Sequence, residues 1–151
     1  MTIQRNVIIC LMAMFFLAGC SQKSDNKNQL KESNQMIKEP SNEKKMKIGI
    51  IIETKEPEKA WNAFRFAVTS LKQGHEVKVF LMGEAVECQE ISHNTFDVQA
   101  QMRSFAEHGG TILACGTCIK SRNMSETEMC PISTMIDCVE MVEWADKVLT
   151  F

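Results

Sequence analysis

Apolar residues follow two different spacings in the part of the chain that begins at residue 46. Short runs rich in valine, isoleucine and leucine are typical of strands that are covered on both faces. Such runs occur at residues 47–53, 75–82, 111–115 and 147–151. Between them, apolar side chains recur every three or four residues, as they do on one face of a helix. This second spacing occurs at residues 57–74, 97–110 and 133–145. The alternating order predicts an α/β fold with three layers, in which helices cover both faces of a mainly parallel sheet.

The last of these helical segments has an apolar stripe that we expect to face the core. Met135, Val139 and Val142 recur at helical spacing, which predicts that they pack against the sheet. Cys138 lies among them and is interpreted as a small buried hydrophobic residue, a common role of free cysteines. Ser133 precedes the first apolar residue of the segment, so we expect its hydroxyl to cap the helix.

The start of the chain forms a separate unit. Arg5 supplies a positive charge, and an apolar run at residues 7–17 leads into the sequence Leu-Ala-Gly-Cys, which ends at Cys20. The run is too short for a lasting transmembrane helix, but it has the length of a secretory signal core. The pattern resembles a bacterial lipobox and predicts a lipoprotein signal peptide at residues 1–19. Lipid on Cys20 would then anchor the protein to a membrane of the cell envelope, outside the cytoplasm. The alternative is an ordinary cleaved signal that happens to end in cysteine.

Residues 21–45 are almost entirely polar or charged. Such a segment cannot bury enough apolar surface to offset the entropy cost of ordering it. We therefore predict that residues 20–45 comprise the lipidated cysteine and a disordered tether, and that one folded domain occupies residues 46–151.

Composition and charge argue against several functions. The chain has 17 Lys or Arg and 19 Asp or Glu residues, for a formal net charge of -2. This balance provides no broad basic surface, so we predict no nucleic-acid partner. No phosphate-cradling GxxxxGK motif occurs, and Gly109-Gly110 precedes a predicted strand, the wrong side for a dinucleotide-binding fingerprint. We therefore predict no bound cofactor.

The positions of the cysteines carry the strongest candidate chemistry. Cys115 ends a predicted strand, and the carboxyl ends of strands are where open parallel sheets place ligands and catalytic groups. Cys118 follows closely, and the basic residues Lys120 and Arg122 would favour the thiolate form. The connection at residues 116–131 is longer than most loops between a strand and a helix, and long loops are often functional. We predict Cys115 and Cys118 as the catalytic residues, with supporting roles for Lys120 and Arg122.

Other interpretations of the cysteines stay open. We expect that the chain has no metal site. The alternative is a zinc site at Cys115, Cys118 and Cys130, although the second close pair of cysteines of a zinc ribbon is missing. A Cys115–Cys118 disulfide could form outside the cytoplasm, in a short ring that would be readily reduced. Several of these residues could also be small core residues. Cys88 lies in a predicted loop and could be exposed or buried.

The chain resembles the DsrE/DsrF-like family, which includes sulfur-relay subunits, over residues 46–151. The segments that carry the resemblance are MKIGIIIE, VFLMGEAVEC, GGTILACGTCIKSR and ADKVLTF. The resemblance implies a compact α/β domain that assembles into homotrimers or hexamers. It also implies that Cys115 carries a persulfide between a sulfur donor and an acceptor protein. Cys118 would then resolve or share the sulfur, while Lys120 and Arg122 would stabilise the anion.

Three functions therefore stay open. The first is sulfur transfer through a persulfide on Cys115, and the second is thiol-disulfide redox chemistry of Cys115 and Cys118. The third is a metal-binding or assembly module without enzymatic activity. The best known relay subunits are cytoplasmic, whereas this chain carries a predicted export signal, and a shared fold does not by itself define a function.

Overall fold

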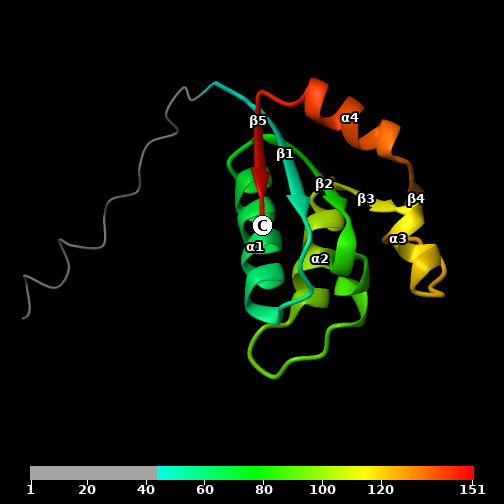
Figure 1. Ribbon diagram of the computed structural model, residues 1–151. Helices are drawn as coiled ribbons and strands as arrows, with labels where there is room; N and C mark the ends of the chain where they lie inside the picture. The colour runs from blue at the N-terminus through cyan, green and yellow to red at the C-terminus, as the bar shows by residue number, and fades with distance from the viewer. Residues whose placement is uncertain (1–43) are drawn as a thin grey trace, which may run out of the picture. The chain divides into compact units, whose positions relative to one another are not determined.

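The computed structural model describes residues 44–151, and within them five parallel strands form one sheet (Figure 1). The strands are β1 (Lys47–Ile52), β2 (Glu76–Leu81), β3 (Thr111–Cys115), β4 (Ile132–Ser133) and β5 (Lys147–Thr150). Their order across the sheet is β4-β3-β2-β1-β5, and each neighbouring pair is parallel. The predicted signal peptide, the predicted lipidation site Cys20 and most of the predicted tether lie outside the described residues.

Helices lie on both faces of the sheet. The chain moves from β1 to β2 to β3 in one direction, so right-handed crossovers put α1 (Pro57–Lys72) and α2 (Val98–Glu107) on the same face. It returns across the sheet between β4 and β5, which puts α4 (Met135–Trp144) on the opposite face. The 3-10 helix η1 (Gly83–Glu90) and the short helix α3 (Gly116–Ser121) follow the carboxyl ends of β2 and β3. None of the helices in residues 44–151 has both the length and the apolar character needed to cross a membrane.

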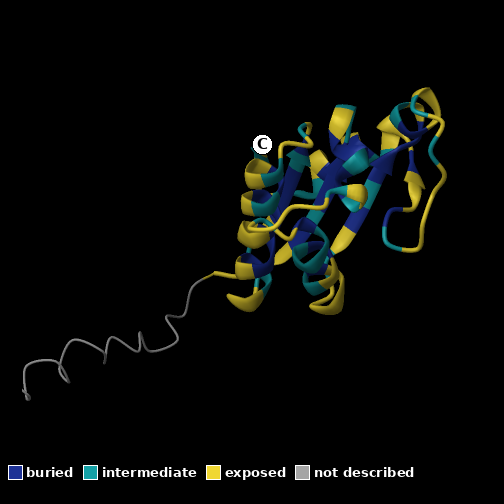
Figure 2. Cartoon of the chain, turned by 90° about the horizontal axis from the view of Figure 1, so that it is seen from below, coloured by how far each residue is buried: buried dark blue, intermediate teal, exposed yellow. Residues whose placement is uncertain are grey.

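The larger core lies between the sheet and helices α1 and α2. Successive side chains of a strand point to opposite faces, and on this face Ile50 of β1 and Val79 of β2 are fully buried. Figure 2 shows buried residues along the strands of the sheet. Phe64 of α1 and Phe105 of α2 are also fully buried and meet edge to face, with 6.1 Å between the ring centroids. The prediction of an α/β fold with a parallel sheet between helices is confirmed. The packing also aligns the carboxyl ends of the strands along one edge, where the candidate site lies.

The exposed face of α4 corrects the prediction for this helix. Met135, Val139 and Val142 are predicted to face the core, but their exposed fractions are 52%, 51% and 42%. Met141 and Cys138 are buried instead, and for Cys138 this agrees with the prediction. The reason is that α4 is apolar on more than one side, so helical spacing alone does not select the side that packs on the sheet.

The start of α4 also differs from the prediction. Thr134, and not Ser133, is the N-cap, because its hydroxyl accepts a hydrogen bond from the Asp137 N–H at 3.4 Å. The Asp137 carboxylate accepts in return from the Thr134 N–H at 2.6 Å, which completes a capping box. Ser133 belongs to β4, where it pairs with Cys115 of β3.

Three short elements were not predicted, namely η1, α3 and β4. The predicted long loop at residues 116–131 is wrong in its first part, because α3 begins directly after Cys115. Cys88 is predicted to lie in a loop, but it lies in η1 and is fully buried. Helices of six and eight residues and a strand of two residues are too short to display a clear period, so their sequences give no clear pattern.

Candidate functional site

Cys115 and Cys118 are brought together where β3 runs directly into α3. Cys115 is the last residue of β3 and the N-cap of α3, and Cys118 lies in the first turn of that helix. Gly116, between them, makes this junction possible. A Cβ at Gly116 would lie 2.8 Å from the Ile132 side chain, so a larger residue would push α3 away from β4. The sequence Cys-Gly-Thr-Cys therefore places two thiols at a tight turn from strand into helix.

Both cysteines line a pocket of about 430 Å³ at the carboxyl edge of the sheet. Lys120 lines it as well, so the structure brings together three of the four residues predicted for the site. Cys115 is buried, with 6% of its surface exposed, and Cys118 is half-buried. The rest of the lining comes from the end of β2, from α3, from β4 and from the start of α4. These residues are Met82, Gly116, Thr117, Ile132, Ser133, Thr134 and Met135.

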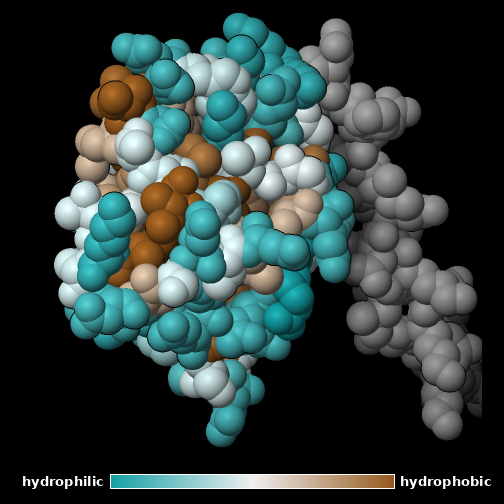
Figure 3. Space-filling view, turned by 90° about the vertical axis from the view of Figure 1, so that its right-hand side faces the viewer, coloured by the Kyte–Doolittle hydropathy of each residue, from teal (hydrophilic) through white to brown (hydrophobic). Residues whose placement is uncertain are grey.

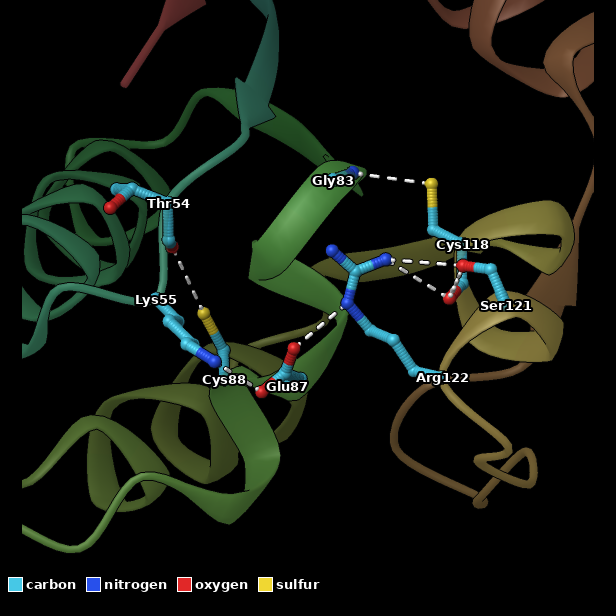
Figure 4. Close-up of polar contacts among 8 residues, drawn as sticks. All are labelled: Thr54, Lys55, Gly83, Glu87, Cys88, Cys118, Ser121 and Arg122. Carbon is cyan, nitrogen blue, oxygen red and sulfur yellow. Dashed lines mark hydrogen bonds and ion pairs between the residues drawn. The ribbon is translucent and has the colours of Figure 1, made fainter.

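A backbone amide contacts the sulfur of Cys118. The Gly83 N–H donates a hydrogen bond to the Cys118 Sγ at 3.2 Å (Figure 4). Gly83 begins η1, has a φ of 57°, and would place a Cβ 3.2 Å from the Glu53 carbonyl oxygen. Glycine is favoured at this position because it adopts a positive φ at low cost and has no Cβ. This partner is not recognisable from sequence, because the two residues are 35 positions apart and a backbone donor leaves no side-chain signature.

Burial raises the pKa of the Cys118 thiol above its ordinary value, and the neighbouring Cys115 thiol adds to the rise. The Gly83 N–H and the positive charge of Arg122 act in the opposite direction without outweighing these effects. Arg122 therefore acts on Cys118 in the direction predicted for a basic neighbour, but its effect on the pKa is smaller than that of burial.

Arg122 contacts the backbone of α3 and not the cysteine sulfurs. Its Nε lies 2.8 Å from the Glu87 Oε1, and its Nη1 donates to the Cys118 carbonyl oxygen at 3.3 Å (Figure 4). The other carboxylate oxygen of Glu87 lies 2.7 Å from the Lys55 Nζ. These pairs connect α3, η1 and the segment after β1. Glu87 and Lys55 have no local sequence signature, because only the tertiary fold brings their charges to Arg122.

The other buried thiols are not part of the pocket lining. Cys88 is fully buried and Cys130 is 1% exposed. Burial raises the pKa of Cys88 to about 12 and that of Cys130 to about 11, and the Cys130 thiol contributes to the rise at Cys88. The alternative zinc set of Cys115, Cys118 and Cys130 is therefore not assembled. Within residues 44–151, no three His, Cys, Asp or Glu side chains are placed to hold a metal ion.

The fold and the pocket together define a small parallel α/β protein with two neighbouring thiols at the end of an inner strand. The chain belongs to the DsrE/DsrF-like family, whose model matches residues 46–151. The recognition of this family from the sequence is confirmed.

Two similar proteins come from archaea. Uncharacterized protein MK0008 of Methanopyrus kandleri is 35% identical over 100 residues, which cover 62% of this chain and 83% of that protein. Uncharacterized protein MJ0989 of Methanocaldococcus jannaschii is 33% identical over 115 residues, which cover 70% of this chain and 100% of that protein.

A solved structure shares the fold. BT1422 from Bacteroides thetaiotaomicron, described as a conserved protein of unknown function, superposes with a TM-score of 0.58 at 21% sequence identity. The match covers 70% of this chain and 95% of that chain.

Proposed function

We propose that this chain is a membrane-tethered thiol protein that carries sulfane sulfur as a persulfide on Cys115. The observation that carries the proposal is the placement of Cys115 and Cys118 in one pocket at the carboxyl edge of a parallel sheet. Membership of the DsrE/DsrF-like family supports it, since this family includes sulfur-relay subunits.

Loading begins when the Cys115 thiolate attacks the outer sulfur of a persulfide donor. The S–S bond of the donor breaks, a new S–S bond forms on Cys115, and the donor leaves as a thiolate. In transfer, the thiolate of an acceptor protein attacks the outer sulfur on Cys115, and Cys115 leaves as a thiolate. Neither step is a net oxidation or reduction, so neither needs a redox cofactor.

The pocket gives the neighbours of Cys115 separate roles. Its volume of about 430 Å³ accommodates one further sulfur atom, and Lys120 supplies a positive charge near the persulfide anion. Cys118 acts as the resolving thiol. Its sulfur attacks the inner sulfur on Cys115, a Cys115–Cys118 disulfide forms, and the outer sulfur leaves as hydrogen sulfide.

The proposal includes attachment to a membrane of the cell envelope through lipid on Cys20. The sulfur donor and acceptor are then proteins that reach this membrane surface. A Cys20→Ser variant tests the attachment, because it should move from the membrane fraction to the soluble fraction of a cell extract. Retention of this variant in the membrane fraction would contradict the lipid anchor.

We also propose that the domain forms a homotrimer or hexamer. On α4, Ile136, Val139 and Val142 are 42–69% exposed, which is unusual for neighbouring apolar residues on a monomer. Figure 3 shows the side of the molecule to which α3 and α4 belong, with apolar side chains exposed among hydrophilic ones. A second copy of the chain would remove this surface from water.

A thiol-disulfide redox function is the second candidate. It is favoured by the proximity of the two thiols, since Cys115 contributes directly to the raised pKa of Cys118. Oxidation of the pair would release two protons and two electrons to a disulfide-bearing partner. A module without enzymatic activity, which serves only in assembly, is the remaining alternative.

Mass spectrometry after incubation with a persulfide donor tests the leading function. The wild-type protein should gain about 32 Da, one sulfur atom, on Cys115. Cys115→Ser should abolish this gain, whereas Cys118→Ser should retain it and hold the persulfide longer, because the resolving thiol is absent. Cys130→Ala is the matched control outside the pocket and should load like wild type.

An unmodified Cys115 at a saturating donor concentration would contradict sulfur transfer. If the same protein formed a reversible Cys115–Cys118 bridge in glutathione buffers, the redox function would replace it. Failure of both reactions would leave the assembly module.

A further inference from the structure

Four sulfur-containing side chains line the pocket at the carboxyl edge of the sheet. Cys115 and Cys118 contribute thiols, and Met82 and Met135 contribute thioethers. The residues come from four places in the fold, namely the end of β3, α3, the residue after β2 and the start of α4. The lining contains no carboxylate and no imidazole. The donor set is therefore soft, with sulfur as its only strong metal ligand.

Soft thiolate and thioether ligands select Cu(I), whereas carboxylates and water suit harder ions. Structural zinc sites take four cysteine or histidine ligands, and this pocket offers only two. We infer that the pocket binds one Cu(I) ion through the thiolates of Cys115 and Cys118, with the thioethers of Met82 and Met135 as additional donors. This site goes beyond the proposed sulfur transfer and does not depend on it, although both would use the same two cysteines.

The backbone holds the two cysteines in place before any ion binds. Cys115 is fixed by strand pairing, since it lies opposite Ser133 of β4. The Cys118 Sγ is held by the Gly83 N–H at 3.2 Å. Ligands that are fixed by their supporting structure lose less freedom on binding, which favours a metal site.

The balance of charge also fits a monovalent ion. One Cu(I) ion and two thiols give a bis-thiolate complex with one negative charge and release two protons. The Gly83 N–H contacts one of these sulfurs, and Lys120 lines the same pocket, so a donor and a positive charge are available for the anionic complex. The metal enters as Cu(I), so no oxidant or reductant takes part in binding.

The two methionines differ in access to solvent. Met135 is 52% exposed, and Met82 is half-buried. Methionine has a flexible, polarizable side chain, so Met135 can contact an ion at the mouth of the pocket and follow it inward. This arrangement supplies the entry path that a buried metal site requires.

The test is an anaerobic titration of the full-length, reduced protein with Cu(I), in competition with a coloured Cu(I) chelator. One ion per chain should bind, and either Cys115→Ser or Cys118→Ser should weaken binding by about 100-fold or more. The double variant Met82→Leu with Met135→Leu should weaken it by about tenfold. The matched controls are Met124→Leu and Cys130→Ala, which lie outside the pocket lining and should bind like wild type.

Thermal unfolding of each metal-free variant shows whether it is folded, so a weaker affinity is not mistaken for loss of structure. X-ray absorption of the Cu(I) complex should detect sulfur ligands only. The inference is overturned if wild type and Cys118→Ser bind Cu(I) equally, or if oxygen or nitrogen ligands appear. The thioether contribution is overturned if the methionine double variant matches Met124→Leu.

Persulfide loading of the metal-free protein is a separate measurement. Cu(I) binding without loading would contradict only the sulfur-transfer function. Loading without Cu(I) binding would contradict only the copper site.

Discussion

The Gly83 N–H points at the Cys118 sulfur from 3.2 Å, and this contact joins the carboxyl ends of two neighbouring strands. Gly83 follows β2, whereas Cys118 lies in the helix that follows β3. Backbone amides are fixed donors that cost little reorganisation when a nearby group becomes charged. The contact therefore lowers the pKa of the Cys118 thiol, against the effect of burial, and orients its sulfur in the pocket.

Replacement of Gly83 by alanine should change both stability and thiol chemistry. The positive φ of 57° is unfavourable for alanine, and the new Cβ would crowd the Glu53 carbonyl oxygen at 3.2 Å. We expect Gly83→Ala to lower the free energy of unfolding by about 1–2 kcal/mol. Displacement of the amide should also raise the pKa of Cys118 further, which slows its alkylation at pH 8. Denaturant unfolding and peptide-level alkylation rates measure the two effects.

Gly109→Ala is the matched control for this change. Gly109 has a φ of 84°, but a Cβ there would have no atom within 4 Å, and the residue is not in the pocket lining. It should lose a similar amount of stability and leave alkylation of Cys118 unchanged. Equal alkylation of Cys118 in both variants would show that the Gly83 amide has no influence on the sulfur.

The position of Cys115 could be predicted from sequence, whereas the environment of Cys118 could not. A short, mainly apolar run that ends in cysteine is a local pattern, and the rule that parallel sheets place sites at strand ends then locates Cys115. The amide of Gly83 and the carboxylate of Glu87 reach the site only through the pairing of strands and helices that are distant in sequence. The pKa of Cys118 depends mainly on desolvation, which is a property of the packed fold, and less on the charge of Arg122 nearby in the chain.

Arg122 should influence Cys118 through its charge. The guanidinium lowers the pKa of the Cys118 thiol against the dominant effect of burial, and its Nη1 holds the Cys118 carbonyl oxygen at 3.3 Å. We expect Arg122→Gln to slow alkylation of Cys118 at pH 8 by about twofold or less, because one of the two groups that oppose the effect of burial on the pKa is lost. Arg122→Lys keeps the positive charge and should restore most of the rate. If lysine and glutamine gave the same rate, the effect would come from lost packing and not from charge.

Cys88 and Cys130, two of the three buried thiols outside the pocket, should make stability fall at alkaline pH. Their pKa values in the folded protein are about 12 for Cys88 and about 11 for Cys130, above the value of about 8.5 for an unfolded cysteine. Between these limits the unfolded chain releases protons that the folded chain retains. Each thiol therefore makes its full contribution to the free energy of unfolding below about pH 8.5. Above that pH, the contribution decreases by roughly 1.4 kcal/mol per pH unit.

Denaturant unfolding from pH 8 to pH 11 measures this dependence. Cys88→Ala and Cys130→Ala should each reduce the slope of unfolding free energy against pH, even if the small cavity lowers stability at every pH. The chain has no tyrosine, so phenol ionisation does not add to the slope in this range. Parallel curves for wild type and both variants would contradict the burial of these thiols.

The apolar side of α4 should drive association of the domain. Ile136 and Val139 are 69% and 51% exposed, so they contribute little to the core of one chain. We expect Ile136→Asp with Val139→Asp to convert an oligomer of trimer or hexamer size into monomers, because charged groups would be buried at the contact. Light scattering during gel filtration gives the mass, and the thermal unfolding of the monomer shows that it is folded.

Phe66→Lys is the matched control, since Phe66 is 41% exposed on α1, a different helix, and its change should leave the mass unaltered. A wild-type protein that is monomeric at high micromolar concentration would contradict this role of α4.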